Sequence, residues 1–304
     1  MTHFTAADVP SQQGRTMIVT GANTGIGFEV AKVLAARGAR VLLACRSKDK
    51  AEAAMRRIGA EIAGADLSLL PLDQADLASV RAAAETAANE PRIDVLINNA
   101  GVMIPPLTRT AQGFELQFGV NHLGTFALTG LLLPKLAESP GSRVVITASI
   151  AHKRGRIDFN NLDAANGYSR MDFYAQSKLA NLLFMFELDR RLRAAGSQIS
   201  AMACHPGVSA SELMRHLPGG TIIAPVMGMM LNTAAQGAWP ALQAATDPAA
   251  KGGDYYGSQG IRDMRGRSGP ARRAPQAIDT AVARRLWDVS VELTGVDPGL
   301  ARAI

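Results

Sequence analysis

The sequence predicts an α/β fold in which one doubly wound parallel sheet of about seven strands carries helices on both faces. Three observations predict it. Short apolar runs typical of buried strands alternate with helical patterns along most of the chain. A glycine-rich turn joins the first of these runs to the first helical pattern. Polar residues follow the ends of the runs, and in a parallel sheet those ends meet at one edge.

The length and composition of the chain are compatible with a single domain over residues 1–304. The 304 residues are 47% hydrophobic, which is enough to bury a sizeable core. The chain has no internal repeat and no linker-like tract. We therefore expect one domain built on one central sheet.

The first expected strand, Thr16–Val19, leads into a glycine turn that reads Thr-Gly-Ala-Asn-Thr-Gly-Ile-Gly over residues 20–27. Gly21 suits the tight turn, Gly25 allows the backbone to approach a phosphate, and Gly27 allows the following helix to pack on the strand. The spacing G-x-x-x-G-x-G departs from the G-x-G-x-x-G fingerprint of Rossmann folds. Because the glycines lie between a strand and a helix N-terminus, they still predict a pyrophosphate site.

The next expected strand, Arg40–Cys45, ends at Arg46, where NAD-binding chains usually carry Asp or Glu for the ribose 2′-hydroxyl. A guanidinium suits a 2′-phosphate instead, because it can bind phosphate oxygens in a bidentate manner. NADP(H) is therefore favoured over NAD(H). A helix over about 48–63 and a strand over 67–72 follow, and Asp73 comes directly after that strand.

The middle of the chain places further polar residues after strands. Asp76 is expected to cap the next helix, and the strand Asp94–Ile97 ends at Asn98-Asn99-Ala100-Gly101. A long helical stretch over about 113–137 contains Asn121. Because asparagine weakens a helix, Asn121 indicates a kink with its amide toward the edge where the strands end.

A second group of polar residues begins at Ser149, which follows the expected strand Arg143–Ala148. Tyr174 and Lys178 are four residues apart in a buried helical run, so their side chains lie on one face of the helix. Free tyrosine has a pKa of about 10, and a neighbouring ammonium favours the phenolate and lowers that pKa. The pair is a candidate acid/base that could exchange a proton with a substrate oxygen.

The C-terminal half contains an expected substrate cover. A strand over 198–203 precedes Pro206-Gly207-Val208, and the segment at about 206–236 is apolar with weak periodicity, as expected of a cover over a ligand. Within it, the apolar stretch 221–231 could act as a lid, a subunit interface or a membrane contact. The remaining expected elements are a helix through 239–245 and a C-terminal extension at about 253–304, with a short strand near 254–256, an arginine-rich loop over 261–273 and a helix over about 278–293.

Composition and charge exclude several classes of protein. The net charge of +6 gathers mainly in the arginine-rich loop, which without a broader basic face does not predict nucleic-acid binding. The sequence contains no cluster of His, Cys and Asp at ligand spacing, so it does not predict a metal site. Cys45 and Cys204 lie in apolar runs, which favours a reducing compartment, and we expect a cytoplasmic protein. Residues 1–13 do not resemble a signal peptide or anchor, and 221–231 is too short to cross a bilayer.

Taken together, these segments resemble the short-chain dehydrogenase/reductase (SDR) family over essentially the whole chain. The matching motifs are the Gly21–Gly27 turn, Asn98–Gly101, Asn121, Ser149, the Tyr174-x-x-x-Lys178 pair and Pro206-Gly207. Four further stretches resemble the retinol dehydrogenase and WW-domain oxidoreductase branch: Leu-Ala-Cys-Arg at 43–46, Val-Asn-His-Leu-Gly at 120–124, His-Pro-Gly-Val at 205–208 and Arg-Arg-Leu-Trp-Asp-Val-Ser at 284–290. The membrane-anchoring N-terminus of animal retinol dehydrogenases is missing here, so their substrate is not carried over.

The resemblance implies an NAD(P)-dependent oxidoreductase that acts on a carbonyl or hydroxyl group of a small, apolar alcohol, aldehyde or ketone. Tyr174 would exchange the proton, and Lys178 would lower its pKa and bind the nicotinamide ribose. Ser149 would hydrogen-bond the substrate oxygen, and Asn121 would hold a water that links Lys178 to solvent. The implied cofactor contacts are Gly21, Asn23, Thr24, Gly25, Ile26 and Gly27 for the pyrophosphate, Arg46 for the 2′-phosphate, Asp73 for the adenine, Asn99, Ala100 and Gly101 for the adenosine side, Tyr174 and Lys178 for the nicotinamide ribose, and Pro206, Gly207 and Val208 for the carboxamide.

Two alternatives stay open at the level of sequence. One is a non-catalytic dinucleotide-binding sensor or interaction protein on the same fold, against which the intact set of Asn121, Ser149, Tyr174 and Lys178 argues. The other concerns assembly, because the family includes dimers and tetramers and this branch includes monomers. A homo-oligomer is therefore compatible with the sequence, as is peripheral contact with a membrane.

Overall fold

The computed structural model describes residues 3–207, 232–260 and 263–302, and the strands in these ranges form one sheet. The strands are β1 (Thr16–Thr20), β2 (Arg40–Cys45), β3 (Leu67–Pro71), β4 (Val95–Asn98), β5 (Arg143–Thr147), β6 (Ser200–His205), β7 (Tyr255–Ser258) and β8 (Ser268–Pro270). Their order across the sheet is β3-β2-β1-β4-β5-β6-β7-β8. The first seven run parallel and β8 pairs antiparallel with β7. The predicted doubly wound α/β class is confirmed, with eight strands among the described residues.

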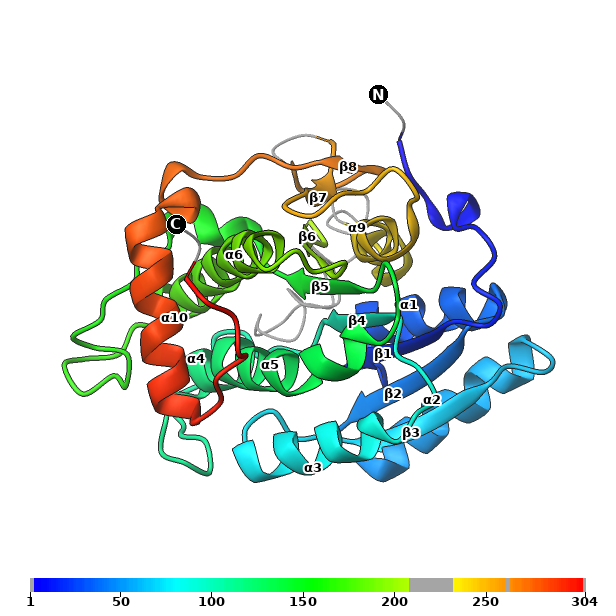
Figure 1. Cartoon of the computed structure of the whole chain (residues 1–304), viewed down its shortest axis with the longest axis horizontal. Coiled ribbons are helices and arrows are strands. Elements are labelled where there is room, and N and C mark those ends of the chain that lie inside the picture. Colours follow the sequence, from blue (N-terminus) through cyan, green and yellow to red (C-terminus); the bar gives the residue numbers. More distant parts are fainter. Residues whose placement is uncertain (1–2, 208–231, 261–262, 303–304) are drawn as a thin grey trace, which may run out of the picture.

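Helices cover both faces of the sheet (Figure 1). The helices are α1 (Gly25–Ala36), α2 (Lys48–Glu61), α3 (Leu77–Ala88), α4 (Leu116–Phe118), α5 (Gly124–Ala137), α6 (Arg170–Ala194), α9 (Ala234–Thr246) and α10 (Thr280–Thr294). Short helical turns are η1 (Ala6–Asp8), η2 (Gly119–Leu123), η3 (Ile150–Arg154) and η5 (Pro275–Ile278). Apolar residues of α1, α2 and α9 pack together on one face, and those of α3, α5 and α6 pack on the other.

The central strands are apolar at almost every position because both of their faces are buried. Ile18 of β1 contributes to the core under α3, α5 and α6, whereas its neighbours Met17 and Val19 contribute to the core under α1, α2 and α9. Outside this sandwich, α10 lies across α5 and α6 (Figure 1). Its Trp287 ring packs 5.3 Å from Phe126 of α5, measured between ring centroids, and so closes the core on that side.

Two details of the strands differ from the sequence predictions. The arginine-rich loop contains β8, a three-residue edge strand whose Ser-Gly-Pro sequence has no apolar alternation to reveal it. The predicted strand over 198–203 is displaced, since β6 runs from Ser200 to His205. The polar His205 belongs to the strand because its side chain is buried at the end of the sheet.

The long helical stretch predicted over 113–137 begins at Leu116 and contains a π-helical turn, η2, at the place where a kink was expected around Asn121. By length and composition, the stretch Leu116–Ala137 could span a membrane, and an 18-residue window within it has a mean hydropathy of 1.2. However, 89% of that 18-residue window is buried inside the structure. This stretch is therefore the core helix of the α/β sandwich.

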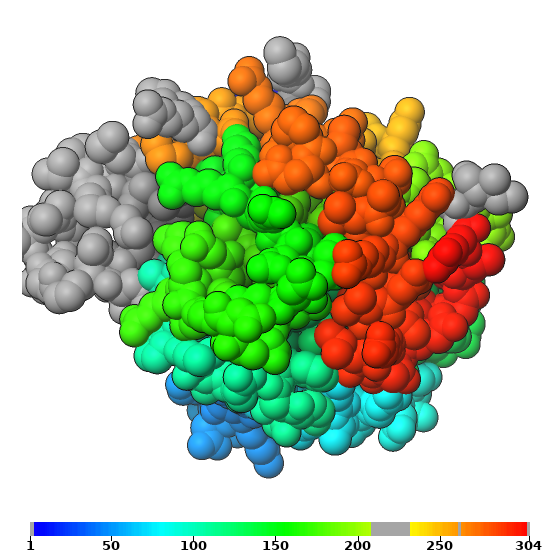
Figure 2. Space-filling model, turned by 90° about the vertical axis from the view of Figure 1, so that its left-hand side faces the viewer, coloured from blue at the N-terminus to red at the C-terminus, as the bar shows by residue number. Residues whose placement is uncertain are grey.

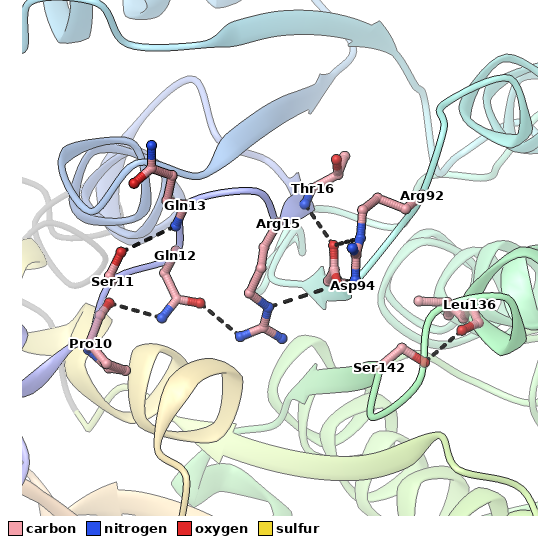
Figure 3. Close-up of polar contacts among 10 residues, drawn as sticks. All are labelled: Pro10, Ser11, Gln12, Gln13, Arg15, Thr16, Arg92, Asp94, Leu136 and Ser142. Carbon is pink, nitrogen blue, oxygen red and sulfur yellow. Dashed lines mark hydrogen bonds and ion pairs between the residues drawn. The ribbon is translucent and has the colours of Figure 1, made fainter.

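The amino ends of the strands form a second edge, which we call the amino-end edge, and it is closed by charged contacts (Figure 3). The buried Asp94 carboxylate accepts hydrogen bonds from the Thr16 N–H (2.8 Å) and from two guanidinium nitrogens of Arg92 (2.9 and 2.6 Å). Arg15 lies 3.9 Å from the same carboxylate and donates to Gln12 at 2.8 Å. These contacts hold the start of β1 and the N-terminal arm against β4.

Candidate active site

A groove of about 320 Å³ opens at the opposite edge, beyond the carboxyl ends of the strands. This is where open α/β sheets bind ligands. Most of the predicted site residues line it: Gly21, Asn23, Thr24, Gly25, Ile26, Gly27, Arg46, Asp73, Asn99, Ala100, Gly101, Ser149, Tyr174, Lys178 and Pro206. Segments far apart in the sequence thus supply one continuous surface.

The glycine turn at one end of the groove has the geometry expected of a phosphate cradle. Gly21 has φ of 69°, which an L side chain rarely adopts. A Cβ on Gly27 would lie 2.5 Å from the Gly21 carbonyl oxygen and 2.5 Å from Asn99 Nδ2, so only glycine fits where α1 begins. The N-terminus of α1 points its free N–H groups and its dipole into this turn, which suits a pyrophosphate. The residues present therefore fit a dinucleotide.

Asn99 and Thr20 hold the cradle from behind. The N–H groups of Asn99 and Ala100 donate to the Thr20 hydroxyl at 3.0 and 2.9 Å, and Asn99 Nδ2 donates to the Thr20 carbonyl at 2.9 Å. Thr20 is fully buried and was not among the predicted site residues. Its position at the end of a strand, directly before Gly21, is the signal that could have identified it.

Arg46 and Asp73 border the groove at the ends of β2 and β3. The Arg46 side chain is 75% exposed, and its Nη1 lies 4.0 Å from Asp73 Oδ2. The other Asp73 oxygen accepts the Ala75 N–H at 2.9 Å, which fixes the carboxylate. Among the described residues, Arg46 is therefore an exposed cation at the rim whose ion pair with Asp73 is weak, and it can turn toward an anion in the groove.

Asn121 does not line the groove but braces it from the π-helical turn. Its Nδ2 donates to the Val102 carbonyl and to Ser177 Oγ, both at 2.9 Å, and its Oδ1 accepts the Val102 N–H at 2.7 Å. A Cβ on Gly101 would lie 3.0 Å from Asn121 Oδ1 and 3.3 Å from Lys178 Nζ, so both atoms border the same small space. In the structure, the side chain that was predicted to hold a water clamps the backbone of Val102.

The candidate acid/base group lies at the other end of the groove. Tyr174 and Lys178 are one turn apart on α6 and are almost fully buried, with exposed fractions of 8% and 5%. Lys178 Nζ lies 5.9 Å from the centre of the Tyr174 ring and donates to the Thr147 carbonyl at 3.2 Å. Ser149 lies beyond the end of β5, and its Oγ accepts the Ala151 N–H at 3.2 Å, so the hydroxyl hydrogen can be donated to a substrate oxygen.

Of the three residues predicted to contact the carboxamide, Pro206 lines the groove. Gly207 is described but is not among the residues that line the groove, and its N–H donates to His205 Nδ1 at 3.2 Å. Val208 and the apolar stretch 221–231 lie outside the described residues. The predicted substrate cover is therefore described only at its two ends, 206–207 and 232–236.

The buried histidines serve packing and hydrogen bonding. Burial lowers the pKa of both His122 and His205 to about 3, so both are neutral near pH 7. His122 Nε2 lies 2.8 Å from Ser290 Oγ of α10, and the His205 ring lies 5.4 Å from the Tyr255 ring. Within the described ranges, no three His, Cys, Asp or Glu side chains are grouped to hold a metal ion.

Comparison with known proteins identifies this arrangement. The family model for short chain dehydrogenase matches residues 15–219, which include the glycine turn and the groups at the other end of the groove. The chain belongs to the short-chain dehydrogenase family. It is accordingly an oxidoreductase that acts on CH–OH or C=O groups with a nicotinamide dinucleotide.

The relatives place this SDR in a retinol dehydrogenase-like branch. Human retinol dehydrogenase 11 is 43% identical over 286 residues, which cover 93% of this chain and 86% of that protein. Bovine dehydrogenase/reductase SDR family member 13 is 42% identical, covering 95% of this chain and 75% of that protein.

Solved structures share the fold. An uncharacterized Mycobacterium paratuberculosis protein is 42% identical with a TM-score of 0.82, covering 98% of this chain and 100% of that chain. An NADP active-site complex of Pseudomonas aeruginosa RhlG is 25% identical with a TM-score of 0.66, covering 81% of this chain and 94% of that chain.

Proposed function

We propose that this SDR is an NADP(H)-dependent oxidoreductase for the carbonyl or hydroxyl group of a small, apolar substrate. The observation that carries the proposal is the single groove that joins the glycine cradle and the rim arginine Arg46 to Ser149, Tyr174 and Lys178. When bound, the dinucleotide supplies or accepts the hydride. The side chains of the protein transfer the proton and hydrogen-bond the substrate oxygen.

In the direction of carbonyl reduction, the Tyr174 hydroxyl donates its proton to the substrate oxygen as negative charge develops there. The Lys178 ammonium stabilises the resulting phenolate, and the Ser149 hydroxyl donates a second hydrogen bond to the same oxygen. In the direction of alcohol oxidation, the same groups act in reverse, with Tyr174 as the base. Burial of Tyr174 and Lys178 strengthens their electrostatic interaction, because little water screens it.

The preference for NADP(H) rests on Arg46. A guanidinium at the groove rim, 75% exposed and 4.0 Å from the Asp73 carboxylate, can meet a 2′-phosphate with two parallel hydrogen bonds. The likeness to RhlG, which was solved with NADP, supports this assignment. We expect Arg46→Ala to weaken NADPH binding about 10- to 100-fold, since charge-assisted hydrogen bonds contribute about 1.5–3 kcal/mol.

Titration of intrinsic fluorescence with NADPH and NADH measures this preference. NADH affinity and thermal stability should stay the same in Arg46→Ala, because the side chain is largely exposed. Arg56→Ala, an exposed arginine on α2, is the matched control and should leave both affinities unchanged. Tighter binding of NADH than NADPH by the wild type would contradict the role of Arg46.

The apolar substrate is inferred from the apolar residues that line the same groove as Tyr174, which include Val102, Met103, Leu116 and Val120. Human retinol dehydrogenase 11, whose name specifies a long apolar alcohol, supports the same class. A screen of lipophilic and hydrophilic aldehydes, ketones and alcohols with both cofactors measures it. Turnover of only hydrophilic compounds would rule out the apolar class and leave the chemistry intact.

Substitution of Tyr174 tests the chemistry itself. Tyr174→Phe removes the proton donor and should lower kcat about 10²- to 10⁴-fold for every accepted substrate, with little change in NADPH affinity. Tyr256→Phe is the matched control, because its hydroxyl donates to Asp254 at 2.7 Å away from the groove. If Tyr174→Phe turns over all substrates at the wild-type rate, the catalytic assignment fails and a non-catalytic dinucleotide-binding protein becomes the better description.

A further inference from the structure

His152 lies one helical turn after Ser149, and both of its ring nitrogens are engaged. Its Nδ1 lies 2.6 Å from the Ser149 carbonyl oxygen, which also accepts the His152 N–H at 3.0 Å. A carbonyl can only accept, so Nδ1 carries the proton and Nε2 is an acceptor. The Ala274 N–H donates to that Nε2 at 3.3 Å. The ring therefore bridges the backbone of Ser149 to the C-terminal extension.

The C-terminal extension secures the rest of the same short helix. Gln276 Nε2 lies 3.5, 3.0 and 3.4 Å from the carbonyl oxygens of His152, Lys153 and Gly155, and donates to them as a shared cap at the end of η3. Lys153 Nζ makes an ion pair of 2.6 Å with Asp263. In Figure 2 the orange segment of the C-terminal extension lies directly against the green segment that follows Ser149.

These contacts help to hold Ser149 in a fixed position, which its role toward the substrate oxygen requires. Ser149 is the N-cap of η3, a helical turn of only five residues between β5 and α6, so regular secondary structure alone holds it weakly. A group that hydrogen-bonds a reacting oxygen must stay within about 0.5 Å of its productive position. The second hydrogen bond to the Ser149 carbonyl, from a side chain that is itself fully buried, supplies that restraint.

We propose that His152 is a positioning residue for Ser149, and that through it the C-terminal extension sets the geometry of the catalytic hydroxyl. His152 does not touch the groove, so it takes no part in proton transfer. The proposal rests on the proposed function, because it assumes that Ser149 hydrogen-bonds the substrate oxygen. Burial also keeps the ring neutral by lowering its pKa, which agrees with a fixed donor on one side and a fixed acceptor on the other.

Two substitutions separate the two halves of the bridge. In His152→Asn, the amide nitrogen can take the place of Nδ1 and donate to the Ser149 carbonyl, while the acceptor for Ala274 is lost. In His152→Gln, the longer amide reaches toward Ala274, while the donor to Ser149 is lost. We expect His152→Gln to lower kcat about 10- to 100-fold, as a misplacement of about 1 Å does, and His152→Asn to stay within a few-fold of the wild type.

A double-mutant cycle with Ser149→Ala distinguishes positioning from a general loss of structure. If His152 acts through the Ser149 hydroxyl, His152→Gln should lower kcat further by less than about twofold in the Ser149→Ala background. The readout is kcat for NADPH oxidation at a saturating concentration of the best aldehyde from the substrate screen, with NADPH affinity measured in parallel and expected to stay the same. Gln276→Ala, which removes only the outer cap, provides a second variant if His152→Gln does not fold, and its smaller effect on kcat should also vanish in Ser149→Ala.

The outcomes separate this proposal from the one on which it rests. An equal loss of kcat from His152→Gln with and without the Ser149 hydroxyl would overturn positioning and leave the role of Ser149 intact. A loss from His152→Asn as large as that from His152→Gln would also overturn it. A Ser149→Ala variant with wild-type kcat would instead refute the role of Ser149 in the proposed function, and the positioning proposal would fall with it.

Discussion

At the amino-end edge of the sheet, Asp94 and Glu90 are held by Arg92 and Arg40 at 2.6 and 2.8 Å. At the carboxyl-end edge, Arg46 lies 4.0 Å from Asp73. Both edges are built from the same strands, yet one pairs its charges closely, whereas the other has an exposed arginine at the rim and carries Tyr174 and Lys178 of α6 in its groove. The difference teaches that charge at the amino-end edge serves stability, whereas polar groups at the carboxyl-end edge are arranged for a ligand that is not part of the chain.

Lowering the pH should have the largest effect on the free energy of unfolding. The folded-state pKa values of His122 and His205 are about 3, below the value of about 6.5 expected when unfolded, so the unfolded state binds more protons between these limits. Stability is thus fully present above pH 6.5 and is lost as the pH falls, by about 1.4 kcal/mol per pH unit for each histidine. For the two histidines together we expect a loss of about 3 kcal/mol between pH 6.5 and 5.

Urea unfolding at a series of pH values measures this loss. His205→Asn should roughly halve the pH dependence, because asparagine does not titrate and can still accept the Gly207 N–H, while His122 still titrates. His3→Gln, at an exposed position, is the control and should leave the pH dependence as in the wild type. The amino-end ion pairs should persist through this range, since Arg40 lowers the pKa of Glu90. A flat wild-type profile above pH 5 would contradict the burial argument.

A methyl group added at either edge should have different consequences. Gly27→Ala places a Cβ against the Gly21 carbonyl, so we expect a loss of about 1–3 kcal/mol in the free energy of unfolding together with weaker NADPH binding. Gly14→Ala, near the amino-end edge, adds its Cβ in open space at φ of 76° and should cost about 1 kcal/mol with NADPH binding unchanged. Urea unfolding and NADPH titration measure both. Weaker NADPH binding by Gly14→Ala would contradict the claim that the amino-end edge serves stability alone.

Removing the charge of Asp94 should have a small effect and should act on stability alone. Asp94→Asn leaves Arg92 and Arg15 without their carboxylate, and because the Arg92 side chain is 47% exposed we expect a loss of about 1.5 kcal/mol. Steady-state kinetics should give an unchanged kcat. A loss of kcat without a loss of stability would show that the amino-end edge communicates with the groove, which the contrast between the edges does not allow.

Much of the fold and of the site could be predicted because local patterns report them directly. The run 40–45 is β2 to the residue, and Asp76 caps α3 by accepting the Ala78 N–H, as its position suggested. The glycine turn, Ser149, Tyr174 and Lys178 could be predicted as site residues because each has a local cue: a turn, a strand end or helical spacing. The structure then brings them to one groove, which the alternation of strands and helices predicted.

Other features depend on contacts between distant residues and have no local cue. Strand β8 exists because Ser268 and its neighbours pair with β7 and with Phe4, and a Ser-Gly-Pro sequence does not predict a strand. The support that Thr20 gives to Asn99 crosses 79 positions of sequence. The bond between His152 and Ala274 crosses 122 positions and depends on the tautomer of a buried ring. Sequence periodicity carries no information about such pairs.

The π-helical turn at Gly119–Leu123 constrains how this chain can change in length. A π turn holds one residue more than the corresponding α turn, so it shifts the angular phase of everything that follows along the helix axis. Here Asn121 faces Val102 and Ser177, while Phe126 after the turn faces Trp287 on α10. Deleting one residue would restore an unbroken α-helix and rotate one set of partners by about 100° against the other. Insertions and deletions are therefore tolerable in the loops on either side, but this helix has to keep its residue count.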